Sequence, residues 1–120
     1  VDDEPNQREP LGRVLEQAGA EVVEVASVDE ALVALERGLP DVIISDIGMP
    51  GRDGYDLLRS IRVLPVKRGG RIPAIALTAY VTPDDRTRAL AAGFQAHLAK
   101  PVESTVLIAA VAAFARGVST

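Results

Sequence analysis

Five polar side chains follow apolar residues of this 120-residue chain in a pattern that could hold a phosphoryl group. They are Asp2 and Asp3 after Val1, Asp46 after residues 41–45, Thr78 after residues 73–77, and Lys100 after residues 95–99. Three neighbouring carboxylates repel one another unless a cation neutralises them. Because the donors are oxygens with no His or Cys among them, they suit a hard ion, Mg²⁺ above all.

The remaining two side chains complete the chemistry of such a site. Lys100 can pair with a phosphoryl group as a point charge, and the Thr78 hydroxyl can donate a hydrogen bond to one of its oxygens. A carboxylate can itself be the nucleophile, which gives an aspartyl phosphate. Phosphoryl transfer at such a site needs little beyond positioning and charge neutralisation.

These side chains meet only if the segments before them are neighbouring parallel strands. Short β-branched runs alternate here with segments of helical spacing, which is typical of βα units on a parallel sheet. We predict strands over residues 21–26, 41–45, 73–77 and 95–99, and we interpret Val1 as the last residue of an additional first strand. Ligands of such sheets bind at the carboxyl ends of the strands, where all five side chains are expected.

Five helices are predicted between and after these strands. Apolar residues recur at helical spacing in four segments, residues 11–18, 31–35, 57–64 and 107–114. Thr82 followed by Pro83 predicts the start of a further helix, the fourth in chain order. Ser27, with Glu30 three residues later, predicts a capping box before the second helix.

The composition excludes several classes of function. Thirteen basic against seventeen acidic residues give a net charge of −4, which argues against a nucleic-acid-binding face. The chain has no Cys, which excludes a disulfide framework, a thiolate metal site and a Cys nucleophile, and fits a reducing cytoplasm. No apolar run is long enough to cross a bilayer, and no signal peptide opens the chain. We therefore expect a cytoplasmic domain with no membrane contact.

Six short motifs, in this order, resemble the receiver domain of two-component response regulators. They are VDDE at residues 1–4, ISD at 44–46, MPG at 49–51, DG at 53–54, LTA at 77–79 and KP at 100–101. The resemblance covers essentially the whole chain, so we predict a single receiver domain over residues 1–120. It implies an α/β, flavodoxin-like (βα)5 doubly wound fold with a five-stranded parallel sheet of order 2-1-3-4-5, whose first strand is largely missing.

The resemblance also assigns roles around the acid pocket. Asp46 is the expected phosphorylation site, which a phosphohistidine of a histidine kinase or histidine phosphotransfer domain would load. Asp3 and Asp46 are expected to ligate Mg²⁺ directly, with the backbone carbonyl of Gly48 as a further ligand. Asp2, the other member of the acid pocket, would act mostly through water. The domain is then a signalling module, not an enzyme with its own substrate.

Beyond the acid pocket, the resemblance concerns the switch and its read-out. Thr78 is the expected switch hydroxyl and Lys100 the phosphate-pairing cation, and the bond between Lys100 and Pro101 resembles the family's cis peptide. Three residues before Lys100 the family usually carries Tyr or Phe, whereas this chain has His97, which we expect to be a partly exposed strand residue. We expect His97 to stay outward as part of a partner-contacting surface. We expect Tyr80 to shield the phosphoryl group and so to slow its loss.

Phosphorylation is expected to change the face built from the fourth helix, fifth strand and fifth helix. An unknown output domain or partner would bind this face, and a homodimer through it is a further expectation. A row of basic residues is most simply interpreted as a solvated face, namely Arg59, Arg62, Lys67, Arg68 and Arg71.

Other interpretations stay open to different degrees. Residues 77–80 and 92–97 resemble receivers attached to hybrid sensor histidine kinases, which is the alternative context. An aspartate-nucleophile phosphatase would need a second Asp two residues after the nucleophile, where this chain has Gly48. A flavin-binding module would need a hydroxyl-rich phosphate loop after the first strand, where this chain has Pro5, Asn6 and Gln7.

Overall fold

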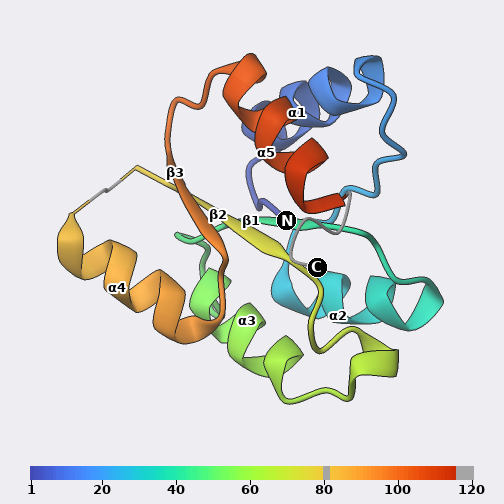
Figure 1. Ribbon diagram of the computed structural model, residues 1–120, viewed down its shortest axis with the longest axis vertical. Coiled ribbons are helices and arrows are strands. Elements are labelled where there is room, and N and C mark those ends of the chain that lie inside the picture. The colour runs from blue at the N-terminus through green and yellow to red at the C-terminus, as the bar shows by residue number, and fades with distance from the viewer. Residues whose placement is uncertain (80–81, 116–120) are drawn as a thin grey trace.

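Three of the predicted strands form a parallel sheet in the computed structural model, which describes residues 1–79 and 82–115. They are β1 (Ile43–Asp46), β2 (Ala74–Thr78) and β3 (Ala96–Ala99), in the order β1-β2-β3. Their register places Asp46 beside Leu77, and Thr78 beside Ala99. Each strand begins one or two residues later than its sequence pattern predicts, and the three end close to one edge of the sheet (Figure 1).

Five α-helices in the described part of the chain cover the two faces of this sheet. Helices α1 (Pro5–Gln17) and α5 (Ser104–Ala115) pack together on one face. Helices α2 (Val28–Arg37), α3 (Gly54–Arg62) and α4 (Pro83–Ala92) lie side by side along the other (Figure 1). A short 3₁₀ turn, η1 (Val66–Arg68), follows α3. This arrangement is the predicted α/β doubly wound fold.

Residues 21–26 do not form a regular strand, which corrects the sequence prediction. The backbone of residues 1–2 lies between this segment and β1, because the Asp46 N–H donates to the Val1 carbonyl at 2.8 Å and the Asp2 N–H to the Val25 carbonyl at 3.1 Å. The backbone order therefore follows the expected 2-1-3-4-5 arrangement. The backbone hydrogen bond between residues 1–2 and this segment, from Asp2 to Val25, does not by itself make a regular ladder.

Helix starts follow the predicted side-chain signals, with one correction. The Thr82 hydroxyl accepts from the Asp85 N–H at 3.1 Å, and the Asp85 carboxylate accepts from the Thr82 N–H, which completes a capping box before α4. At α2 the predicted box is half formed. The Ser27 hydroxyl accepts from the Glu30 N–H at 3.1 Å, but the Glu30 carboxylate accepts from the Ala26 N–H at 3.4 Å instead.

The core lies mainly between the sheet and α3. Leu57, Leu58 and Ile61 of α3 and Ile75 of β2 are at most 1% exposed, and all five residues of β2 are buried. A strand buried on both faces is expected at the centre of a parallel sheet. Within the described residues, no helix is long and apolar enough to span a membrane.

Arg62 is not part of a solvated basic face, which corrects the prediction for this one residue. Its Nε and Nη2 atoms donate to the Gly93 carbonyl at 3.0 and 2.8 Å, and its Nη1 donates to the Gly70 carbonyl at 3.2 Å. Burial lowers the pKa of this guanidinium. Gly93 has φ +115°, and a Cβ there would lie 2.7 Å from the Arg62 Cγ, so the contact requires glycine. The other four basic residues are exposed.

Candidate functional site

The ends of the three strands bring a carboxylate, a hydroxyl and an ammonium together. Asp46 and Thr78 are the last residues of β1 and β2, each 7% exposed, and Lys100 directly follows β3. The Lys100 Nζ lies 2.9 Å from the Asp46 Oδ1. The Lys100 N–H also donates to the Thr78 carbonyl at 2.8 Å, which extends the ladder between β2 and β3 to this point. These three residues therefore lie together, as the sequence predicts.

Three carboxylates form a cluster at the same edge. One oxygen each of Asp2, Asp3 and Asp46 lies within 4.8 Å of the others. Asp2 is 5% exposed, and its Oδ1 accepts from the Glu4 N–H at 2.9 Å, whereas its Oδ2 is buried without a hydrogen-bond partner. A buried carboxylate oxygen without a partner is costly unless a cation or proton satisfies it. The cluster therefore has the donors and the unsatisfied atom that fit a hard cation.

The start of α1 holds the acidic turn in place. Pro5 is the first helical residue, where its fixed φ suits a helix and its missing N–H costs nothing. One turn later, the Arg8 Nη1 donates to the Asp2 carbonyl at 2.9 Å, and its Nε lies 3.3 Å from the Glu24 Oε1. Arg8 thus connects the acidic turn to the segment that follows α1.

A cleft of about 390 Å³ opens over the strand ends. It is lined by residues from the strand ends, the acidic turn and the first turn of α1, namely Asp3, Glu4, Gln7, Asp46, Ile47, Gly48, Thr78, Ala79 and Lys100. A Cβ at Gly48 would meet nothing within 4 Å, so the space beside Asp46 is open there. Gln7 was not predicted as a site residue, yet its Oε1 accepts from the Lys100 Nζ at 2.8 Å.

Close packing fixes the backbone beneath Asp46. Gly54 begins α3, its N–H donates to the Ile47 carbonyl at 3.0 Å, and a Cβ there would lie 2.5 Å from the Asp46 carbonyl oxygen. Asp53 caps the helix by accepting from the Asp56 N–H at 3.0 Å. Only glycine allows α3 to start this close to the strand, which gives a structural reason for the DG motif at residues 53–54.

The orientation of the His97 imidazole differs from the expectation. His97 is half-buried in β3, but both ring nitrogens are buried and have no hydrogen-bond partner, so the imidazole does not point its polar atoms outward as predicted. Burial lowers the pKa of His97; of the nearby charges, Asp85 on α4 opposes this effect and Arg86 adds to it. The Lys100–Pro101 bond is cis, as the resemblance implies. Tyr80 lies outside the described residues.

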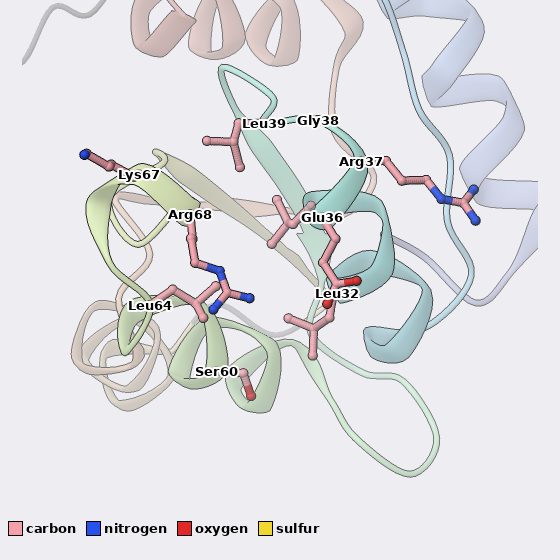
Figure 2. A pocket seen from close by; sticks show the side chains of 10 residues that line it. Leu32, Glu36, Arg37, Gly38, Leu39, Ser60, Leu64, Lys67 and Arg68 are labelled. Atoms are coloured by element: carbon pink, nitrogen blue, oxygen red, sulfur yellow. The ribbon is translucent and has the colours of Figure 1, made fainter.

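A second hollow, of about 510 Å³, lies at the C-terminal ends of α2 and α3 (Figure 2). Leu32, Leu39 and Leu64 contribute to its apolar lining, and the side chains of Arg37 and Lys67 point away from it on opposite sides. Within the described chain, the group of acidic side chains that could hold a metal is at the strand ends and not here. The strand-end cleft is therefore the candidate site.

Comparisons with known proteins found a family model and several relatives that match this chain. Residues 1–112 match the family model described as response regulator receiver domain. The chain is 46% identical over 108 residues to an uncharacterized 14.6 kDa protein in the sodA1 3′ region of Leptolyngbya boryana, covering 90% of this chain and 81% of that one. It is 37% identical to probable histidine kinase 2 of Oryza sativa subsp. indica, covering 89% of this chain but only 11% of the kinase.

A solved structure with the same fold carries a metal in the corresponding domain. The receiver domain of the sensor histidine kinase PA1611 from Pseudomonas aeruginosa PAO1 superposes with a TM-score of 0.86. It is 34% identical, and the match covers 97% of this chain and 93% of that one. That structure is described with a magnesium ion coordinated in the active site cleft.

Proposed function

The chain belongs to the response regulator receiver domain family, and we propose that Asp46 accepts a phosphoryl group from a phosphohistidine. The observation that carries this proposal is the ion pair of 2.9 Å between Asp46 and Lys100 on the floor of the open cleft. It pairs a nucleophilic carboxylate with a cation beside the space that a phosphoryl group would enter. The proposed unit of function is one receiver domain over residues 1–120.

The transfer itself is a displacement at phosphorus. An oxygen of Asp46 attacks the phosphorus, and the new O–P bond forms as the P–N bond of the phosphohistidine breaks. The electron pair of that bond leaves with the imidazole of the donor. Lys100 neutralises charge on the phosphoryl oxygens, and the Thr78 hydroxyl donates a hydrogen bond to one of them. The positions of these groups at adjacent strand ends support this assignment.

Mg²⁺ is the cation that we propose for the carboxylate cluster. Asp3, Asp46 and the Gly48 carbonyl would hold it, with Asp2 acting through water. When bound, the ion neutralises negative charge on the carboxylates and on the incoming phosphoryl group. The unpartnered Oδ2 of Asp2 and the oxygen-only donor set support this proposal, as does the magnesium described for the PA1611 receiver domain.

The phosphoryl donor that we propose is a histidine kinase or a histidine phosphotransfer domain. The similarity to parts of a rice histidine kinase and of PA1611 is the reason to keep a hybrid-kinase receiver as the alternative to a response regulator. The output surface that we propose is the face of α4, β3 and α5, where two copies of the domain would also pair.

Acetyl phosphate with Mg²⁺ tests the acceptor assignment. We expect the protein to gain one phosphoryl group by intact mass, and Asp46→Asn to gain none. Asp41→Asn is the matched control, because Asp41 is exposed and lies just before the other end of β1. Equal labelling of the Asp46→Asn and Asp41→Asn variants would refute the assignment.

A further inference from the structure

The Lys100 ammonium is held from two sides, and only one of its partners belongs to the carboxylate cluster. We propose that Gln7 is a positioning residue for phosphoryl transfer, which keeps the Lys100 ammonium over the cleft while the charge on Asp46 changes. This inference rests on the proposed function. It adds a residue of α1 that none of the receiver motifs in the sequence contains.

The hydrogen-bond geometry leaves one donor of the ammonium for the substrate. The Lys100 Nζ lies 2.8 Å from the Gln7 Oε1 and 2.9 Å from the Asp46 Oδ1, and the Lys100 side chain is 22% exposed. An ammonium has three N–H donors in all. The two contacts fix its direction and use two donors, so a third remains for a phosphoryl oxygen in the cleft that all three residues line.

The Gln7 side chain projects from a well-fixed part of the backbone. It is the third residue of α1, after Pro5 at the first position, and its N–H donates to the Glu4 carbonyl at 3.0 Å. The next residue, Arg8, donates both to the Glu4 carbonyl and, through its side chain, to the Asp2 carbonyl. The amide that holds Lys100 is thus tied to the same turn that carries the acids.

A neutral acceptor suits this place better than a fourth carboxylate would. Three acids already cluster here, and a further negative charge would repel an anionic phosphoryl donor. The Asp46 contact must be rearranged when one of its oxygens becomes bonded to phosphorus. The Gln7 contact involves no reacting atom, so it can persist from the free to the phosphorylated state and keep Lys100 in place.

Lysine-selective NMR tests the contact directly. The chain has two lysines, Lys100 and the exposed Lys67, so labelled lysine gives one signal from the site and one internal reference. We expect Gln7→Leu to shift the Lys100 side-chain signal toward that of a free lysine. The matched control is Gln17→Leu, an exposed position at the last residue of the same helix, which should leave Lys100 unchanged. An unchanged Lys100 signal in Gln7→Leu would overturn the proposal.

A rescue variant separates positioning from a general effect on α1. In Gln7→Glu a carboxylate oxygen of the same reach replaces the amide oxygen, so the Lys100 signal should remain that of a held ammonium. A structural role of the helix start alone would predict that the Leu and Glu variants behave alike. That result would also overturn the proposal.

Phosphorylation rates test the role in transfer. With acetyl phosphate and saturating Mg²⁺, we expect Gln7→Leu to be phosphorylated about fivefold more slowly than the wild type, the effect of one lost hydrogen bond to a charged group in a partly exposed site. Gln17→Leu should match the wild type. If the wild type itself takes up no phosphoryl group, the proposed function falls and this role with it. If the wild type is phosphorylated and the two variants react equally fast, the role of Gln7 alone is refuted.

Discussion

Asp2 and Asp3 are adjacent in the chain, yet their surroundings differ. Asp2 is buried and uses one carboxylate oxygen to accept a backbone hydrogen bond, whereas Asp3 is half-buried and lines the cleft. Glu4 also lines the cleft, but it is exposed and its carboxylate is not a member of the cluster. We therefore expect a carboxylate of the cluster to contribute more to cation binding than an exposed carboxylate that only lines the cleft.

We expect Asp3→Ala to weaken Mg²⁺ binding on the order of tenfold, because it removes one of the carboxylates that we propose as direct ligands of the ion. Glu4→Ala, the matched control, should change the affinity less than about twofold, as expected for an exposed and screened charge. The chain has no Trp, so calorimetry or amide NMR shifts are the suitable measurements. Equal affinities of the two variants would contradict the assigned roles.

His97 allows a second prediction, because burial lowers its pKa in the folded state while Asp85 opposes and Arg86 reinforces the shift. The unfolded chain then binds more protons than the folded one near the ordinary pKa of 6.5, so stability falls as the pH falls through that value. We expect the chain's single histidine to titrate below 6.5 by NMR. As the pH is raised from about 5.5 to about 7.5, the free energy of unfolding of His97→Phe should therefore increase less than that of the wild type. A midpoint at or above 6.5 would contradict a buried, unpaired imidazole.

At the scale of elements, Arg62 of α3 forms hydrogen bonds with two turns that lie at the starts of β2 and β3. Its guanidinium reaches the turn after α4 and the turn before β2, and its Nη2 also donates to the Gln95 Oε1, which in turn accepts from the Ala74 N–H at 2.7 Å. The side chain thus fixes α3 against the starts of β2 and β3. Because these strands end at the cleft, Arg62 supports the site from the opposite edge of the sheet.

We expect Arg62→Ala to lower the free energy of unfolding by about 2 kcal/mol, since it leaves partly buried carbonyls without their charged donor. Arg62→Lys should restore little of this, because an ammonium cannot reproduce the fork of donors. Arg59→Ala is the control: its ion pair with Asp56 is largely exposed and screened by solvent, so its loss should lower the free energy of unfolding far less. Urea unfolding followed by circular dichroism measures all three. Similar losses in the Arg62 and Arg59 alanine variants would refute the role of Arg62.

The elements that sequence alone predicted are those with local signals. Helix α4 begins where Thr82 and Pro83 predict it, and the buried strands follow their apolar runs. The segment 21–26 has the same kind of pattern but no regular strand, because a strand is defined by its hydrogen-bonded ladder and not by local spacing alone. The contact of Gln7 with Lys100, and that of Arg62 with Gly93, were not predicted because the partners are 93 and 31 residues apart, and no local spacing encodes such contacts.

Across the whole molecule, the sheet connects the cleft with the face of α4, β3 and α5. Thr78 at the cleft is beside Ala99 in the register, and two residues earlier Ala76 is beside His97. Helix α4, which contributes two of the charges around His97, packs against β3. A movement of Thr78 toward a phosphoryl group would therefore first displace the backbone of β3 and then helix α4.

The corresponding prediction concerns the response of the whole domain to phosphorylation. Thr78→Ala should still be phosphorylated on Asp46 but should lose one hydrogen bond to the phosphoryl group, which lowers the ratio of switched to unswitched molecules about fivefold. Amide shifts of α4 and β3 on adding acetyl phosphate and Mg²⁺ measure this ratio. Thr105→Ala, an exposed threonine on α5, serves as the control and should respond like the wild type.

His97→Ala distinguishes the route of the signal. Removing an imidazole whose nitrogens are buried and unpaired should leave phosphorylation of Asp46 and the movement of Thr78 nearly intact, because His97 does not line the cleft. The shifts of α4 should change, however, since the space beside that helix is altered. If Thr78→Ala responds fully while His97→Ala blocks the response, the signal does not start at the hydroxyl, and the assigned switch is wrong.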